Sequence, residues 1–270
     1  MNKFELVLTD TKTLFGITLY RIRALVAIPS CDISPGDLGG YIEKESNLSH
    51  DGTAWVYDNA WVYGSAQVYG SARVYDNALV SGSAQVYDNA WVCDDADVYG
   101  NARVYNDAQV YGSAWVSGSA KVYGSALVSG DAWVYDAARV SDNAEVQGNA
   151  QVYGNAEVYG IAQVYGNARV YNDALVCSSA LVCGSARVYG NARVYDDAQV
   201  YDSARVYDSA RVYDAAEVYG NAWVYDNARV YGSARVFDNA QVYGYTHVSG
   251  DECVWQRTTR EEEGVINEEV

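Results

Sequence analysis

A six-residue pattern of apolar and polar positions repeats along most of this chain. Alanine stands at every sixth position from Ala54 to Ala240, and valine follows two residues after each, which makes 32 consecutive hexads without an insertion. Most hexads read A-x-V-Y and end in two residues that are mostly Gly, Asp, Asn or Ser. The alternation is typical of a strand with one buried face, and the last two residues tolerate tight or left-handed turns. The pattern therefore predicts a four-residue strand and a corner in every hexad.

A strand this short cannot bury its apolar face alone, so the hexads are expected to stack into a solenoid. Three hexads make one triangular coil of about 18 residues, and the chain holds enough hexads for about 10 to 11 coils of a single-stranded parallel β-helix. In such a coil Ala and Val fill a narrow bore, while Tyr and the variable residue x point outward. We therefore expect an all-β protein in which Ala54, Ala72, Ala90 and Ala108 share one column.

Residues that are 18 positions apart lie on the same face of such a coil. The second of the three faces combines four Trp residues with the fullest Tyr column, which runs from Tyr63 to Tyr243. Stacked aromatic rings stabilise neighbouring strands by about 0.2–1 kcal/mol per contact, so a purely structural role accounts for the Tyr column. Flat aromatic surfaces also mark contacts with another subunit, a polymer or a sugar. The second face is thus the predicted binding face, and its residues are Trp61, Trp115, Trp133, Tyr135 and Trp223.

Composition and charge narrow the choice of partners. The formal net charge is −17 at pH 7, which disfavours nucleic acid and anionic membranes. The third face carries two basic runs beside Tyr, Arg103 to Arg139 and Arg193 to Arg229, but Asp residues at neighbouring corners are expected to neutralise them. The first residues lack the apolar core of a secretory signal, and no apolar run approaches the roughly 18 residues of a membrane span. We expect a cytoplasmic protein without nucleic-acid or membrane partners.

The flanks of the repeat differ from it in composition. Residues 1–50 contain two strand-like stretches, at 3–8 and 18–28, and a Gly-rich passage that leads into the hexads. An open solenoid end exposes unpaired strand edges, so this segment is the expected β cap. Residues 51–250 form the β-helix, and residues 251–270, with five Glu among the last ten residues, are expected to form a solvated acidic tail.

Three phrases of the sequence carry a family resemblance. "LYRIRAL", "GDLGGYIEKESNLS" and "GTAWVYDNAWVYG" together resemble the hexapeptide-repeat proteins of gut bacteria and their phages, which are often labelled acyltransferases. The resemblance covers nearly the whole chain and implies that the coils are left-handed. The transferase label follows from the shared fold, and a shared fold does not establish a function.

Candidate catalytic and metal-binding residues are few. Hexapeptide acyltransferases resemble one another in using a His as general base, and the related zinc carbonic anhydrases need three. This chain has two His, His50 in the expected cap and His247 in the last coil, and no His lies within a hexad or two of Cys93, Cys177 or Cys183 in the sequence. Cys177 and Cys183 occupy Tyr positions and are expected to be exposed. The sequence thus predicts no catalytic residues, no metal and no cofactor.

These observations favour a non-catalytic β-solenoid that serves as a rigid scaffold or a binding surface. We expect its exposed Tyr and Trp faces to mediate self-association or to bind a protein or carbohydrate partner. A hexapeptide-repeat acyltransferase of unknown substrate is the alternative.

Overall fold

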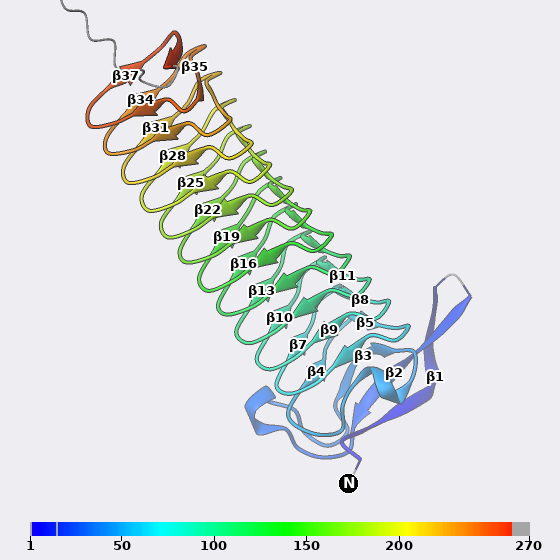
Figure 1. The fold of residues 1–270 in the computed structure, drawn as a ribbon. Helices are drawn as coiled ribbons and strands as arrows, with labels where there is room; N and C mark the ends of the chain where they lie inside the picture. The colour runs from blue at the N-terminus through cyan, green and yellow to red at the C-terminus, as the bar shows by residue number, and fades with distance from the viewer. Residues whose placement is uncertain (1, 15, 261–270) are drawn as a thin grey trace, which may run out of the picture. The chain divides into compact units, whose positions relative to one another are not determined.

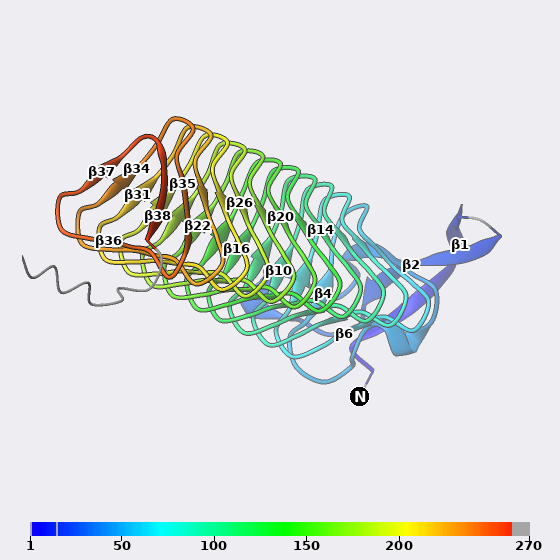
Figure 2. The same cartoon turned by 45° about the horizontal axis from the view of Figure 1, so that its top comes forward.

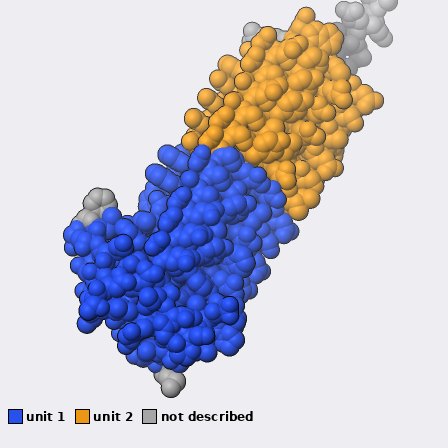
Figure 3. Space-filling view, turned by 180° about the vertical axis from the view of Figure 1, so that it is seen from behind, with its two compact units in different colours: residues 1–148 blue, residues 149–270 orange. Residues whose placement is uncertain are grey.

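The computed structural model describes residues 2–14 and 16–260 of the chain. Their contacts divide the chain into two compact units, residues 1–148 and 149–270, which are blue and orange in Figure 3. Both units consist of stacked coils of short β-strands (Figures 1 and 2). The described residues include no helix that is long and apolar enough to cross a membrane. The all-β solenoid expected from the hexads is thereby confirmed.

In all hexads but the last, the strand is shorter than the four residues expected. Only residue x and Val are in strand conformation, as in β5 (Trp61–Val62). Between two corners the backbone donates two hydrogen bonds to the next coil. In the β5 hexad these run from Trp61 N to Ala78 O at 2.9 Å and from Tyr63 N to Val80 O at 3.0 Å. The expected burial is confirmed, because the Ala and Val positions of the hexads are fully buried.

Unit 1 contains three parallel faces of two-residue strands, each defined by the residues listed next. The first face holds β4 (Trp55–Val56), β7 (Arg73–Val74), β10 (Trp91–Val92), β13 (Gln109–Val110), β16 (Leu127–Val128) and β19 (Glu145–Val146). The second face holds β5, β8 (Leu79–Val80), β11 (Asp97–Val98), β14 (Trp115–Val116) and β17 (Trp133–Val134). The third face holds β6 (Gln67–Val68), β9 (Gln85–Val86), β12 (Arg103–Val104), β15 (Lys121–Val122) and β18 (Arg139–Val140).

Unit 2 repeats the same plan with its own three faces. Its first face holds β22 (Gln163–Val164), β25 (Leu181–Val182), β28 (Gln199–Val200), β31 (Glu217–Val218), β34 (Arg235–Val236) and β37 (Cys253–Val254). Its second face holds β20 (Gln151–Val152), β23 (Arg169–Val170), β26 (Arg187–Val188), β29 (Arg205–Val206), β32 (Trp223–Val224), β35 (Gln241–Gly244) and β38 (Arg257–Arg260). Its third face holds β21 (Glu157–Val158), β24 (Leu175–Val176), β27 (Arg193–Val194), β30 (Arg211–Val212), β33 (Arg229–Val230) and β36 (His247–Val248).

The register of the strands confirms the coil length. Trp55 pairs with Arg73 and Trp91 pairs with Gln109, so paired residues are 18 positions apart. The same spacing holds in unit 2, where Arg211 pairs with Arg229. Ala54, Ala72, Ala90 and Ala108, which precede first-face strands, are each fully buried. The left-handed coiling remains a prediction from the family resemblance.

The corners explain the preference for Asp and Gly. Asp94 and Asp226 sit at corner positions with φ of 58° and 57°, in the left-handed region that most side chains avoid. Their carboxylates accept hydrogen bonds from the corner N–H of the next coil, Gly112 N at 2.9 Å and Gly244 N at 3.1 Å. A corner Asp therefore offsets its backbone strain by tying two coils together.

A β cap covers the first coil of unit 1, as the sequence predicts. β1 (Phe4–Leu14) and β2 (Ile17–Ala24) form an antiparallel hairpin. β3 (Leu38–Ile42) pairs antiparallel with β2 and parallel with β5, which joins the hairpin to the second face. Two short 3-10 helices, η1 (Pro29–Cys31) and η2 (Glu45–Asn47), complete the cap.

The Gly-rich passage was not expected to form a strand, and the close approach of β3 to the first coil explains its composition. A Cβ on Gly40 would lie 2.6 Å from the carbonyl oxygen of Ala60, and a Cβ on Gly39 would lie 2.5 Å from that of Val56. Two adjacent glycines therefore let β3 pack directly on the coil backbone.

The cap supplies the hydrogen-bond donors that the first coil needs. Since backbone N–H groups of one coil donate to carbonyls of the next, the first coil presents unpaired carbonyl oxygens. Five cap groups donate to them: Tyr41 N to Ala60 O, Glu43 N to Val62 O, Ser49 N to Val68 O, the Asn47 Nδ2 amide to Ala66 O, and the Lys3 Nζ ammonium to Ala54 O. The cap thus terminates all three faces of unit 1.

The C-terminal segment begins with strands. β37 and β38 lie within residues 251–260, where β38 pairs in parallel with β35. The Glu-rich end that the sequence assigns to an acidic tail, residues 261–270, lies outside the described residues.

Candidate binding surface

Two exposed tryptophans stack on the second face of unit 1. Trp115 on β14 and Trp133 on β17 are directly paired in the sheet. Their ring centroids are 4.9 Å apart with an interplanar angle of 7°, and the two residues are 38% and 40% exposed. Because each side chain belongs to an x position, the pair points away from the Ala and Val core. The sequence predicted this pair as part of the binding face, and the structure brings the two rings together.

Neighbouring aromatic rings extend this pair on both sides. Tyr135 contacts the edge of the Trp133 ring, with centroids 6.5 Å apart and an angle of 74°. Tyr99, which is 39% exposed, meets Trp115 edge to face at 6.3 Å. Ser117 occupies the position between Tyr99 and Tyr135 in their column and is 9% exposed. Because its side chain is small, this column has no ring beside the middle of the Trp pair. We call Tyr99, Trp115, Trp133 and Tyr135 the aromatic shelf.

Trp61 lies on the same face but apart from the aromatic shelf. Leu79 and Asp97 occupy the two positions between Trp61 and Trp115 in the sheet. Trp61 is half-buried and pairs with Tyr41 of the cap. Burial raises the pKa of the Asp97 carboxyl, which reflects the apolar surroundings of this face. Trp61 is therefore placed beside the cap rather than beside the exposed pair.

Trp223, the remaining predicted residue, belongs to unit 2 and has different neighbours. The Arg205 guanidinium lies 4.9 Å from the centre of the Trp223 ring, and Tyr207 meets that ring edge to face at 6.4 Å. Such cation–π contacts stabilise by about 0.5–1 kcal/mol at exposed sites. Trp223 is half-buried, so these contacts account for it as a packed residue of its own coil.

Stacked Tyr ladders lie beside the third face in unit 1 and beside both the second and the third face in unit 2. In unit 2 the column from Tyr153 to Tyr243 stacks along the second face, with successive centroids 4.8–5.1 Å apart. In unit 1 the corresponding column is interrupted by Ser81 and Ser117, and the ladder is found beside the third face instead, in Tyr69, Tyr87, Tyr105 and Tyr123. In unit 1 the exposed Trp pair therefore lies beside an interrupted Tyr column, while the continuous ladder lies beside another face.

The ladders change the chemistry of the phenols. Burial, followed by the neighbouring Tyr189 and Tyr225 hydroxyls, raises the pKa of Tyr207 to about 12. The Tyr207 phenol thus stays neutral at physiological pH, which suits its packing between the rings of Tyr189 and Tyr225.

Another exposed tryptophan was not singled out from the sequence. Trp91 on the first face of unit 1 is 37% exposed, meets Tyr75 edge to face at 6.2 Å and lies 5.4 Å from the Arg73 guanidinium. Arg73 and Tyr75 belong to the preceding coil. The 18-residue period of the sequence could therefore have predicted that they lie beside Trp91.

The two histidines have structural neighbours. His50 stacks on Phe4 with ring centroids 4.4 Å apart, and its Nδ1 accepts a hydrogen bond from Lys3 N at 3.1 Å. His50 is thus part of the cap, as expected. His247 is exposed and meets the ring of Tyr231 edge to face at 6.2 Å.

The cysteines depart from expectation at one position. Cys183 is half-buried, but Cys177 is buried, at 6% exposed, so the expectation that both are exposed is wrong for Cys177. A side chain smaller than Tyr does not project beyond the coil, and the adjoining Tyr159 hydroxyl hydrogen-bonds with the Cys177 thiol.

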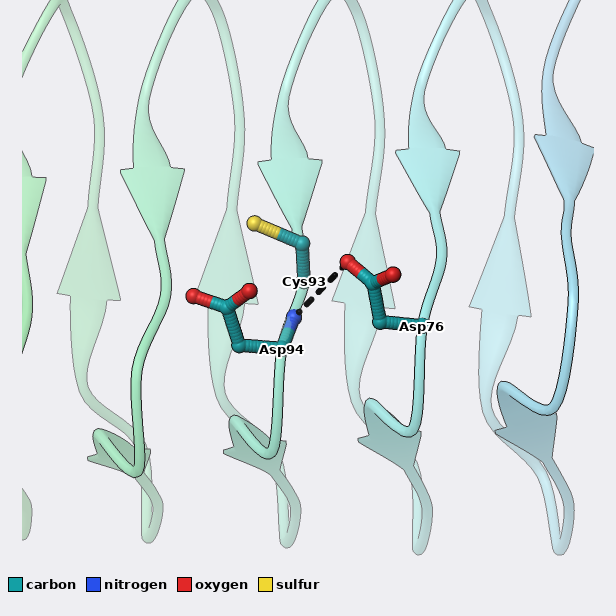
Figure 4. Close-up of side chains that lie close together, drawn as sticks. All are labelled: Asp76, Cys93 and Asp94. Atoms are coloured by element: carbon teal, nitrogen blue, oxygen red, sulfur yellow. Dashed lines mark hydrogen bonds between the residues drawn. The ribbon is translucent and has the colours of Figure 1, made fainter.

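Asp76, Cys93 and Asp94 form a cluster whose donor atoms lie within 4.8 Å of one another, and such residue types could hold a metal ion (Figure 4). The Asp76 carboxylate accepts a hydrogen bond from Asp94 N at 3.4 Å, and the Asp94 carboxylate accepts one from Gly112 N. Burial raises the pKa of the Cys93 thiol, which keeps it protonated and weakens it as a ligand. The corner hydrogen bonds explain why the two carboxylates lie here.

Fold and surface together define a parallel β-solenoid repeat protein with exposed aromatic side chains. The family described as YdcK beta solenoid repeat matches the chain in eight stretches, residues 54–70, 72–88, 96–112, 138–154, 162–178, 186–202, 198–214 and 222–236. Each full match spans about one coil, in agreement with the strand register. No curated protein shows significant similarity to the chain.

Proposed function

We propose that this protein is a non-catalytic scaffold that binds another macromolecule through the aromatic shelf of unit 1. The observation that carries the proposal is the stacked, outward-facing pair of Trp115 and Trp133, each more than a third exposed. Exposed aromatic pairs offer a large, rigid contact area, and such anchors dominate the energetics of many interfaces.

The nature of the shelf favours a partner with a flat, apolar surface. The x positions of this face in unit 1 are Trp61, Leu79, Asp97, Trp115 and Trp133, which include no basic side chain. A second copy of the chain offers the same aromatic surface in return, and a polysaccharide offers the apolar faces of its rings. Nucleic acid is disfavoured by the acidic net charge.

Sedimentation velocity of the double variant Trp115→Gln, Trp133→Gln against the parent tests self-association. We expect the parent to associate with increasing concentration and the variant to lose that association, while circular dichroism shows an unchanged solenoid. Trp91→Gln is the matched control, because Trp91 is similarly exposed but lies on the first face. Retardation in polysaccharide gels tests the carbohydrate partner with the same variants. A parent that neither associates nor is retarded leaves only a spacer role.

The alternative function, a hexapeptide-repeat acyltransferase, would use His50 or His247 as general base. His50 has its Nδ1 occupied by the Lys3 N–H. Release of free thiol from a panel of acyl-CoA substrates, lost on substitution of His247 by Gln, would favour the enzyme over the scaffold.

A further inference from the structure

A cavity of about 500 Å³ opens where the cap meets the third face of unit 1. One wall is formed by the cap residues Glu45, Ser46, Leu48, Ser49 and His50, and the other by Gln67, Val68 and Tyr69 of the first coil. Its volume falls within the range of small-molecule sites. It is separate from the aromatic shelf, which lies on the second face.

A local break in the coil register creates this cavity. In regular coils, donors two residues apart bond to acceptors two residues apart, as in Tyr57 N to Val74 O and Asn59 N to Asp76 O. Here Ser49 N donates to Val68 O and Thr53 N donates to Gly70 O, so donors four residues apart span acceptors two apart. The segment from Ser49 to Thr53 thus contains two additional residues. The cavity lies beside this break, with Ser49, His50 and Tyr69 in its lining.

Tyr69 is the end of the Tyr ladder of unit 1. One face of its ring stacks on Tyr87, with centroids 4.8 Å apart and an angle of 2°. The residue that lies next to Tyr69 in the preceding turn is Ser49, because Leu48 pairs with Val68 and Ser49 N donates to Val68 O. A serine has no ring and cannot continue the stack. Because Tyr69 lines the cavity, a flat ring bound there would take the place of the missing ladder member.

The other lining groups suit a neutral, hydroxylated ligand. The buried Leu48 and Val68 side chains provide an apolar floor. Because His50 Nδ1 accepts the Lys3 N–H, the neutral His50 ring carries its proton on Nε2, and stacking on Phe4 holds the ring in place. Glu45 contributes an exposed carboxylate and Gln67 an exposed amide. No Lys or Arg is among the residues that line the cavity, which disfavours an anionic ligand.

We propose that this cavity binds a neutral sugar ring of monosaccharide size, whose apolar face stacks on Tyr69 and whose hydroxyl groups hydrogen-bond with Glu45, His50 and Gln67. The sugar extends the Tyr ladder by one ring. The hydroxyl groups donate to the Glu45 carboxylate and accept from Gln67 and from His50 Nε2–H. The site is independent of the aromatic shelf and of any role in association.

Saturation-transfer difference NMR on the full chain, with a panel of methyl glycosides and of neutral aromatic heterocycles, tests the proposal. We expect at least one methyl glycoside to bind the parent and the Trp115→Gln, Trp133→Gln variant equally. Tyr69→Ala should raise its Kd by at least about tenfold, and Tyr69→Phe should retain binding because the ring remains. Glu45→Gln, an exposed substitution that leaves the fold intact, should also weaken binding.

The matched control is Tyr123→Ala, at the opposite end of the same ladder and outside the cavity. It removes one stacked phenol, as Tyr69→Ala does, but should leave the glycoside Kd unchanged. The proposal is overturned if no methyl glycoside binds, if only heterocycles bind, or if Tyr69→Ala and Tyr123→Ala bind equally well.

Discussion

The ammonium group of Lys3 donates a hydrogen bond of 2.7 Å to the carbonyl oxygen of Ala54. Lys3 is 3% exposed, and its side chain fills the place of a backbone N–H that a preceding coil would otherwise supply. A buried charge thus terminates the first face of unit 1, and burial lowers the pKa of Lys3 from 10.5 to about 8.

This pKa predicts a pH-dependent contribution to stability. Between about pH 8 and 10.5 the unfolded chain binds the Lys3 proton more strongly than the folded protein, so the contribution of Lys3 to stability rises as pH increases through this window. Lys3→Met lacks this titration, while its tyrosines titrate as in the parent. We expect the melting temperature of the parent, relative to that of Lys3→Met, to increase from pH 7.5 to pH 10. A pH-independent difference would contradict a depressed pKa.

Removal of the cap should promote edge-to-edge assembly of the coils. Deleting residues 1–50 exposes the carbonyl oxygens of Ala60, Val62 and Val68, which the cap now pairs. An unpaired parallel edge is a template for other strands. Light scattering across a concentration series should show aggregates or fibres for the truncated chain. The cap is dispensable if the truncated chain stays monodisperse at high concentration.

In unit 2, a charged substitution at an inward position should destabilise the protein, while the same substitution at the adjacent outward position should not. Val152 is fully buried, and Val152→Asp places an unpaired carboxylate in the Ala and Val bore, at a cost of several kcal/mol or of protonation. Gln151, one residue earlier, faces outward and is half-buried, so Gln151→Asp should change stability by no more than about 0.5 kcal/mol. Thermal denaturation of both variants makes the comparison. Equal losses would refute the assignment of inner and outer positions.

The corner Asp residues should contribute both conformation and hydrogen bonding. Asp214 has φ of 57°, and its carboxylate accepts a hydrogen bond from Gly232 N at 3.0 Å. Asp214→Ala loses the bond and keeps the strain, so we expect a loss of about 1–2 kcal/mol. Asp214→Gly loses the bond but relieves the strain, so its loss should be smaller. Denaturant midpoints of the two variants test this order, and a more stable Ala variant would contradict it.

Much of the fold could be predicted because the hexad is a local code repeated many times. The size of Ala and Val, the alternation of inward and outward positions and the corner residues each act within six residues, and stacking preserves them from coil to coil. The 18-residue register, the buried columns and the stacked pair of Trp115 and Trp133 were predicted on this basis. The structure shows all three, and each depends only on contacts with the adjacent coil.

Features that depend on more distant contacts were not predictable in this way. Trp55 occupies an outward position but is fully buried, because Phe4 of the cap packs against it. The strand β3 follows from the fit of Gly39 and Gly40 against the coil backbone, and the cavity beside Tyr69 follows from the register break at residues 49–53.

The sequence by itself determined which side chains point inward and which residues stack on one another, because both depend only on the six-residue period. Tertiary structure alone decided which of the outward side chains remain accessible. Exposure at Tyr69, Trp55 or Trp115 depends on whether the cap, a smaller neighbour such as Ser117 or another ring covers the position. The contacts made by the cap join segments that share no repeat, so no local period encodes them.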